Sequence, residues 1–128
     1  MSEALEQEMV CSYLKANYPD VIFISDASGL KLPKGQAAKW SRLKSNKGMP
    51  DLIILEPRRA AHGLCLELKR SGEKVVDKHG TPKSLHISKQ LQILDKLYKK
   101  GYATAMAIGF ENARDIINQY LGDGPVSP

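Results

Sequence analysis

The stretch GMPDLIILEPRRAAHGLCLELKR (residues 48–70) governs both the predicted sheet and the predicted chemistry of this chain. Two short apolar segments in it, DLIIL (51–55) and LCLELK (64–69), are rich in β-branched and aliphatic residues, a composition typical of strands. The loop between them (56–63) is polar and basic. We therefore expect the two segments to pair as an antiparallel hairpin.

Three charged residues interrupt these apolar segments. Side chains along a strand alternate between two faces, so Glu67 and Lys69 share one face. Asp51 opens the neighbouring strand directly after Pro50, whose missing N–H suits a strand entrance, and a hairpin brings Asp51 beside Glu67. Two adjacent carboxylates resist joint ionisation, and a divalent cation removes that repulsion. Oxygen ligands favour Mg²⁺ or Mn²⁺, and Lys69 would hold a scissile phosphate or orient the attacking water.

The pattern has a simpler interpretation that must be weighed. An isolated Glu-x-Lys is more often a solvated pair on a strand than a catalytic motif. Pro-Asp followed by Glu-Leu-Lys, both inside apolar strands, is more specific and favours hydrolysis of a phosphodiester. His62, His79 and His86 lack metal-ligand spacing, and we interpret them as histidines of surface loops.

The rest of the chain predicts one α/β domain. Its 128 residues fit a single domain, assigned here to residues 1–122, and the tail 123–128 has nothing to bury and is expected to be disordered. The predicted order is α-β-β-β-α-β-α, which indicates a mixed sheet flanked by helices. Apolar periodicity predicts helices at 2–17, 88–100 and 111–121 and further strands at 21–25 and 102–109. It places Leu5 on the apolar stripe of the first helix and Tyr98 on the inner face of the second.

Positive charge is concentrated in the polar segment 26–50, which contains a possible short helix at 37–43. The formal net charge is +5, and Arg58 and Arg59 follow in the next loop. This clustering favours contact with a phosphate backbone, although a lysine-rich soluble surface would look the same. Trp40 would stack on a base or sugar, or anchor the segment. The clustered cations are Lys31, Lys34, Lys39, Arg42, Lys44 and Lys47.

Cysteine use and hydropathy bear on the compartment. Cys11 and Cys65 lie within apolar patterns, which indicates buried free thiols in a reducing compartment; a disulfide is the alternative. No apolar run is long enough for a membrane span, and the acidic N-terminus is unlike a secretory signal. We therefore expect a cytoplasmic protein with no membrane partner.

These motifs resemble the PD-(D/E)XK nucleases and, more narrowly, the virus-type replication-repair nuclease (VRR-NUC) domain in its small stand-alone phage and bacterial form. The central match comprises Gly48, Pro50-Asp51 and Glu67-Leu68-Lys69-Arg70. The resemblance implies a restriction-endonuclease-like core. It extends to SEALEQEMVCSYL, ASG…AAKWSRLK and SKQLQILDKLYKKGYATAMAIGFENARDIINQYL, and so covers nearly the whole chain.

The resemblance also implies residue roles. Asp51 and Glu67 would ligate the metal, with the Leu68 backbone carbonyl as a further ligand. Lys69 would be the catalytic lysine. Gln90 would support the water on the metal or the phosphate.

An acid in the first helix also belongs to the family pattern. Glu3 with Gln7 fits its E-x-x-x-Q form, with the two side chains one turn apart. Glu6 is the alternative, because it falls within the apolar stripe of the helix, where the family position is usually apolar. We favour Glu3, and either acid would also suit a helix N-terminus without any catalytic role.

The resemblance implies a Mg²⁺- or Mn²⁺-dependent DNA endonuclease similar to Holliday-junction resolvases. It would act as a homodimer on branched DNA in repair, in a bacterium or a phage-infected cell. A nuclease for flaps or nicked duplexes is one alternative. A non-catalytic DNA-binding module with the same fold is the other.

Overall fold

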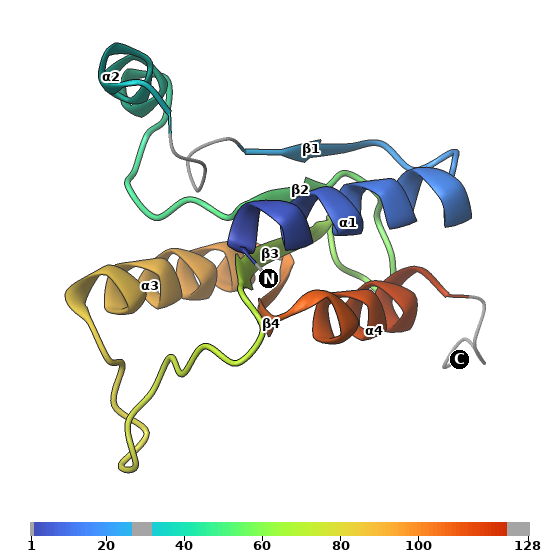
Figure 1. Cartoon of the computed structure of the whole chain (residues 1–128). Helices are drawn as coiled ribbons and strands as arrows, with labels where there is room; N and C mark the ends of the chain where they lie inside the picture. Colours follow the sequence, from blue (N-terminus) through green and yellow to red (C-terminus); the bar gives the residue numbers. More distant parts are fainter. Residues whose placement is uncertain (1, 27–31, 123–128) are drawn as a thin grey trace.

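The computed structural model describes residues 2–26 and 32–122. Within them a four-stranded sheet is covered by helices on both faces (Figure 1). The predicted tail and Lys31 lie outside the described residues. The elements in chain order are α1 (Glu3–Asn17), β1 (Phe23–Ser25), α2 (Lys34–Arg42), β2 (Leu52–Ile54), β3 (Leu64–Lys69), α3 (Leu85–Lys99), β4 (Ala103–Ile108) and α4 (Phe110–Leu121).

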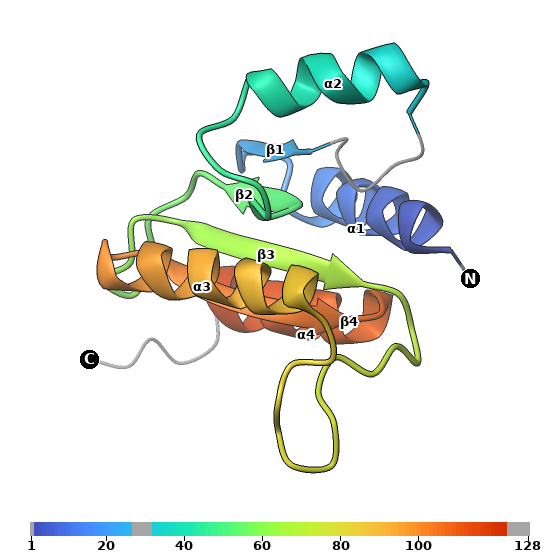
Figure 2. The same ribbon diagram turned by 90° about the vertical axis from the view of Figure 1, so that its left-hand side faces the viewer.

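The sheet is mixed and has the order β1-β2-β3-β4. β1, β2 and β3 are successively antiparallel, whereas β4 runs parallel to β3. The crossover between β3 and β4 contains α3, which covers one face, and α1 and α4 cover the other face (Figures 1 and 2). The predicted hairpin and the predicted mixed α/β class are both confirmed.

Alternation along β3 separates an apolar face from a polar one, although all six residues of the strand are buried. Leu64, Leu66 and Leu68 point into the core between the sheet and the helices α1 and α4. The side chains of Cys65, Glu67 and Lys69 alternate with these and lie on the opposite face, where Gln90 of α3 donates to Glu67. The charged residues of β3 are thus held on a covered face instead of in solvent.

The N-cap residue indicates the first residue of a helix more accurately than the apolar periodicity does. The Ser2 hydroxyl accepts a hydrogen bond from the Leu5 N–H at 3.1 Å, as expected of an N-cap. The Ser84 hydroxyl accepts one from the Ile87 N–H at 3.1 Å, so α3 begins at Leu85 and not at the predicted 88.

Two predicted apolar stripes are wrong in part. Leu5 is 47% exposed, while Glu6 and Gln7 beside it are buried. Tyr98, which the periodicity places on the inner face, is 67% exposed, because it lies in the last turn of α3, beyond the buried part of that helix. The buried face of α1 therefore includes two polar residues, Glu6 and Gln7, which the apolar periodicity does not indicate.

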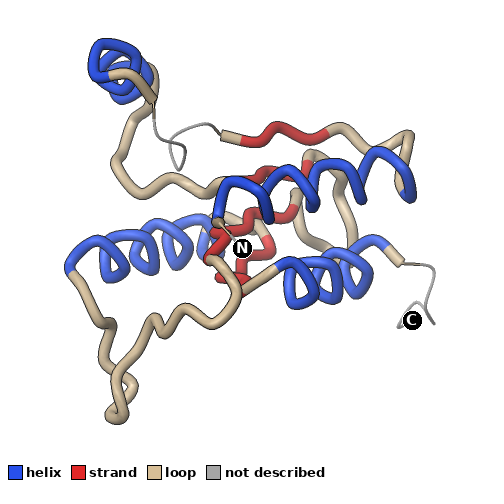
Figure 3. The backbone as a smooth tube through the Cα atoms, in the orientation of Figure 1, coloured by secondary structure: helices blue, strands red, loops and turns tan. Residues whose placement is uncertain are grey.

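The segment between β1 and β2 projects from the sheet. Its helix, α2, has no buried residue and stands apart from the other elements (Figure 1). The loop from β3 to α3 also extends away from the sheet (Figure 3). Cys11 and Cys65 are free thiols, as expected, but only Cys65 is buried, whereas Cys11 is partly exposed. No helix in the described parts of the chain is long and apolar enough to cross a membrane.

Candidate active site

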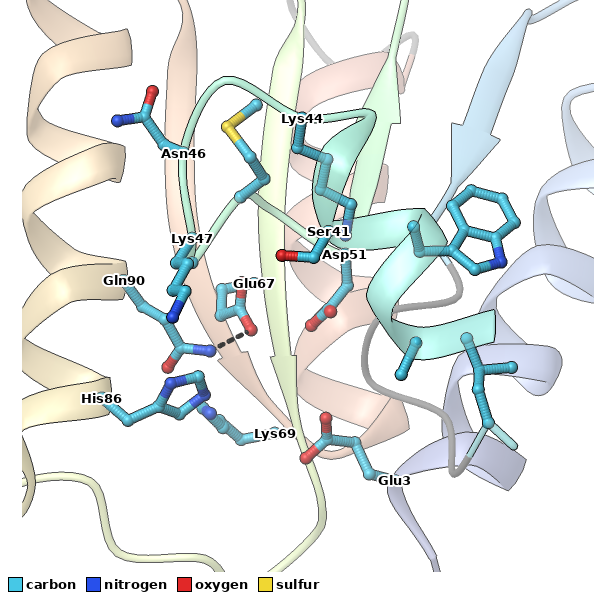
Figure 4. A pocket seen from close by; sticks show the side chains of 15 residues that line it. Glu3, Ser41, Lys44, Asn46, Lys47, Asp51, Glu67, Lys69, His86 and Gln90 are labelled. Carbon is cyan, nitrogen blue, oxygen red and sulfur yellow. Dashed lines mark hydrogen bonds between the residues drawn. The ribbon is translucent and has the colours of Figure 1, made fainter. Parts of the chain in front are cut away.

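Pairing of β2 with β3 brings two carboxylates together. The register aligns Leu52 with Leu66, so the preceding Asp51 lies opposite Glu67, on the same face of the sheet. Asp51 is 3% exposed and Glu67 is 2% exposed. The Leu68 N–H donates to Asp51 Oδ2 at 2.7 Å. Gln90 Nε2 donates to Glu67 Oε1 at 2.6 Å (Figure 4).

The buried pair is electrostatically costly. Burial raises the pKa of Asp51 above its ordinary value, although hydrogen bonds and the Lys69 ammonium oppose the shift. Burial, followed by the charge of Asp51, raises the pKa of Glu67 to about 10. Near neutral pH the pair therefore retains a proton unless a cation replaces it.

The donor set fits a hard divalent cation. Within the described part of the chain, Glu67 Oε2 and Gln90 Oε1 are buried oxygens without a hydrogen-bond partner. Mg²⁺ is typically held by one or two carboxylates together with substrate phosphate oxygens. No cluster of three or more His, Cys, Asp or Glu side chains suited to a metal occurs among residues 2–26 and 32–122. These oxygens suit an ion shared with the substrate.

Because of Pro50, the backbone carbonyl oxygen of Leu68 is available as a further ligand for a cation. Lys69 O accepts from the Gly109 N–H at 2.7 Å, so Lys69 makes its backbone bonds toward β4. The adjacent Leu68 therefore directs its carbonyl toward β2, where the register places Pro50 opposite it. Because Pro50 has no N–H, it cannot donate to that carbonyl. This geometry suits the Leu68 carbonyl as the third predicted ligand.

Glu3 reaches the site from the N-terminal turn of α1. It lines the same cavity as Asp51, Glu67 and Lys69. Burial, followed by the charge of Asp51, raises the pKa of Glu3 above its ordinary value. Lys69 itself is 6% exposed and points into this cavity (Figure 4). The structure thus brings the favoured N-terminal acid to the predicted carboxylates.

Glu6, the alternative acid, has a different environment. It accepts hydrogen bonds from the Ser71 N–H at 2.7 Å, from the Ser71 hydroxyl and from the Phe110 N–H at 3.2 Å. Burial alone would raise the pKa of Glu6, but these hydrogen bonds lower it below the ordinary value. Glu6 therefore ties α1 to the loop after β3 and to the start of α4.

Gln7, the expected companion of Glu3, is also directed elsewhere. Gln7 Nε2 donates to Ser25 Oγ at 2.6 Å and to the Asp26 carbonyl at 2.7 Å. It is 6% exposed and joins α1 to the end of β1. Its role is to position the first helix, which carries Glu3 into the cavity.

These groups surround a cavity of about 570 Å³. Its floor is acidic, its rim carries cations, and α2 with the adjoining segments supplies an apolar wall. The cavity is lined by Glu3, Leu32, Ala37, Trp40, Ser41, Lys44, Asn46, Lys47, Gly48, Met49, Asp51, Glu67, Lys69, His86 and Gln90.

The predicted DNA-contacting cations divide into two groups. Lys44 and Lys47 line the cavity, and Lys44 forms an ion pair with Asp26 at the end of β1. The other three are exposed on α2 and are not part of the cavity lining: Lys34, Lys39 and Arg42. Arg58 and Arg59, in the loop between β2 and β3, lie at the opposite end of that hairpin from Asp51.

One lining residue, His86, is misread from the sequence alone. His86 lies in the first turn of α3 and not in a surface loop, one turn before Gln90 and on the same side of the cavity (Figure 4). Their spacing of four residues is the available signal, but it requires the correct helix start. Gly48 has a φ of +80°, and a Cβ there would lie 3.4 Å from the Gln90 backbone nitrogen. The space would admit a Cβ, so it is the positive φ that favours glycine at this position.

Comparison with known proteins bears on the family. No family model and no curated protein matches the chain. A solved structure described as a VRR_NUC domain protein matches with a TM-score of 0.69 and 28% sequence identity. The match covers 100% of this chain and 98% of that one. Agreement in fold and sequence over the full length supports assigning this chain to the VRR-NUC domain family.

Proposed function

We propose that this chain is a metal-dependent, structure-selective DNA endonuclease that hydrolyses phosphodiester bonds. The observation that carries the proposal is the convergence of Asp51, Glu67 and Lys69 on one cavity, each no more than 6% exposed. Burying three charged groups together is costly and does not strengthen a fold. The similarity to a VRR_NUC domain protein supports a nuclease of the PD-(D/E)XK type.

The roles of the side chains follow from their positions. Asp51 and Glu67, with the Leu68 carbonyl, would hold Mg²⁺ or Mn²⁺. When bound, the cation would polarise the phosphodiester and neutralise charge on the departing oxygen. Gln90 holds one carboxylate oxygen of Glu67 and so leaves the other directed at the ligand.

Lys69 and Glu3 flank the carboxylate pair. The Lys69 ammonium would donate hydrogen bonds to a non-bridging phosphate oxygen and stabilise charge that develops there. Glu3 lies in the same cavity and would accept a hydrogen bond from the attacking water. Both residues would thus act on the substrate without ligating the metal.

The substrate that we propose is branched DNA. The resemblance to Holliday-junction resolvases favours a four-way junction, for which a homodimer with two related sites would suit cutting of paired strands. Repair or recombination in a bacterial or phage-infected cytoplasm would be the setting. A flap or nicked duplex is a second candidate, because the indole of Trp40, which is 41% exposed, lines the same cavity and suits contact with an accessible base.

A non-catalytic DNA-binding module is disfavoured by the same burial. Phosphate contacts that only position DNA are made by accessible cations, such as those of α2. A buried set of two acids and a lysine serves no such contact. We therefore keep this alternative only as an outcome of the activity test.

The test is cleavage of labelled four-way junction, flap, nicked duplex and linear duplex DNA with Mn²⁺, with an EDTA control. Native chain should cut at least one branched substrate in preference to linear duplex, and Asp51→Asn should not. Asp95→Asn is the matched control, because Asp95 is an exposed carboxylate of α3 paired with Lys99 at 2.9 Å. Equal cutting by the native chain and Asp51→Asn would overturn the proposal.

A further inference from the structure

The helix α2 presents an apolar wall to the cavity. Leu32, Ala37 and Trp40 all line it, and Met49 continues the apolar lining toward β2. No residue of α2 is buried, and Trp40 is 41% exposed. Trp40 is therefore not an anchor that holds the projecting segment on the core, which was one of its two interpretations.

One face of α2 is turned toward the cavity. Ala37, Trp40 and Ser41 have the spacing of neighbours on a single helix face, and all three line the cavity. The cations Lys39 and Arg42, which lie on the same helix, are not part of that lining. The helix thus directs its aromatic and small side chains inward, while two of its charges remain for the outer surface.

The two sides of the cavity differ in chemistry. The floor carries Asp51, Glu67 and Lys69, which suit a phosphate together with a divalent cation. The α2 wall carries an indole, which suits a flat aromatic face. A ligand that satisfies both sides needs a phosphate at one end and an aromatic ring at the other. A nucleotide has this arrangement, and aromatic side chains of this kind serve as stacking platforms for bases.

We propose that the indole of Trp40 stacks on an unpaired nucleobase next to the scissile phosphate. The inference rests on the proposed nuclease function and specifies its substrate class. In a continuous duplex both faces of each base are covered by neighbouring bases, so the indole can stack only on a base that is unpaired or turned out of the helix. Of the two substrates proposed above, stacking of this kind favours a flap, which offers an unpaired nucleotide, over a four-way junction, in which the bases are paired.

The fluorescence of Trp40 can show whether a base stacks on its indole. It is the single tryptophan of the chain, so intrinsic tryptophan fluorescence comes from this site alone. In EDTA, which prevents cleavage, the native chain is titrated with a short dye-labelled oligothymidine and with an abasic oligomer of equal length and charge. Dye anisotropy measures binding of each oligomer, and Trp40 emission measures stacking.

Oligothymidine should quench Trp40 emission and bind more tightly than the abasic oligomer, which should bind through its phosphates without quenching. Equal quenching by the two oligomers, or binding of oligothymidine without quenching, would overturn the inference. Failure of oligothymidine to bind would overturn it as well. None of these outcomes depends on cleavage, so the inference can fail while the nuclease function survives.

A second measurement uses variants in the Mn²⁺ cleavage assay. Trp40→Ala should lower kcat/KM on a flap about 5- to 150-fold, the usual effect of losing one base–aromatic stack, and Trp40→Phe should restore most of it. Leu43→Ala is the matched control, because Leu43 is a 78% exposed apolar residue at the end of the same helix that does not line the cavity.

The Trp40→Ala loss should be several-fold smaller on a nicked, fully paired duplex. An equal loss on both substrates would overturn the assignment to an unpaired base. Unchanged thermal melting of Trp40→Ala, expected because α2 has no buried residue, separates these effects from unfolding. Absence of cleavage by the native chain would instead count against the proposed function, while the quenching result would still decide the role of Trp40.

Discussion

The floor and the α2 wall of the cavity are built in opposite ways. On the floor, Asp51, Glu67 and Gln90 are each no more than 5% exposed and are joined by hydrogen bonds to each other or to the β3 backbone. On the wall, no residue of α2 is buried, and Trp40 is 41% exposed. The sheet and these hydrogen bonds hold the side chains of the floor in one arrangement. The helix α2 of the wall is joined to the sheet through the segments that precede and follow it.

This difference indicates that the floor and the α2 wall have separate roles in chemistry and in substrate selection. Groups that act on the reacting bond must be pre-organised, and a central strand of a covered sheet holds side chains in place. Groups that select the substrate can lie on a projecting segment, as binding residues commonly do. Changes to the floor should therefore alter the chemistry, and changes to the wall should alter substrate preference and affinity.

The largest expected effect follows from removing one charge of the floor. Asp51→Asn keeps the shape of the side chain but removes a metal-binding carboxylate, and should lower the cleavage rate by at least about 10³-fold. Single-turnover cleavage with Mn²⁺ measures the effect, and circular dichroism should show an unchanged fold. A reduction of tenfold or less would mean that the floor is not the reacting centre.

The second prediction concerns pH and metal. The raised pKa of Glu67, about 10 against 4.5 for an ordinary glutamate, means that the folded chain holds a proton which the unfolded chain has released. The stability from this group is fully present below pH 4.5 and is lost as the pH rises toward 10. Glu67 therefore lowers the Tm of the metal-free chain progressively from pH 6 to pH 9.

A bound cation should reverse this trend. Mn²⁺ replaces the proton, so it should bind more tightly at pH 8 than at pH 6 and raise the Tm more at the higher pH. At a Mn²⁺ concentration a hundredfold above Kd, the metal should raise the Tm by roughly 10 °C. Glu67→Gln has no proton to displace and should show a small shift at both pH values. Differential scanning fluorimetry measures both effects, and a larger shift at pH 6 would contradict the assignment.

The two acids of α1 give a third prediction. Glu3→Gln should lower cleavage about 10- to 100-fold with little change in stability, because Glu3 lines the cavity beside the carboxylate pair. Glu6→Gln should lower the free energy of unfolding by about 1–3 kcal/mol, because Glu6 accepts three hydrogen bonds. Urea titration and cleavage on both variants should give opposite patterns, and matching patterns would remove the distinction between the acids.

The smallest effect is expected on the outer surface of α2. Replacing Lys39 and Arg42 together by Ala should weaken DNA binding alike for all sequences and reduce the salt dependence of log K by about 0.7–0.9 for each phosphate that the variant no longer neutralises. Arg58→Ala, at the other end of the β2–β3 hairpin, should leave the slope unchanged. Anisotropy titrations from about 50 to 200 mM salt, the range over which phosphate binding weakens steeply, measure the slopes.

Local patterns are sufficient for much of the fold. The strand predicted at residues 64–69 has the bounds of β3, because a short apolar run with one acid and one lysine on alternate positions has few other interpretations. The hairpin places Asp51 beside Glu67 through the alternation of side chains together with the register of β2 on β3. The start of α3 is missed because its cap, Ser84, precedes the apolar periodicity that indicates the helix.

The sequence by itself determined the identity of the floor: which carboxylates and which lysine share a face follows from pleat geometry over a few residues. Only the tertiary structure decided which acid of α1 enters the cavity. Glu3 and Glu6 lie on different sides of the helix, and the elements packed there give Glu3 a place in the cavity lining and Glu6 a hydrogen bond from Ser71. Tertiary structure also brought Trp40 and His86 to the same cavity from distant segments. Such convergence depends on how helices pack on a sheet, and no local pattern of residues encodes it.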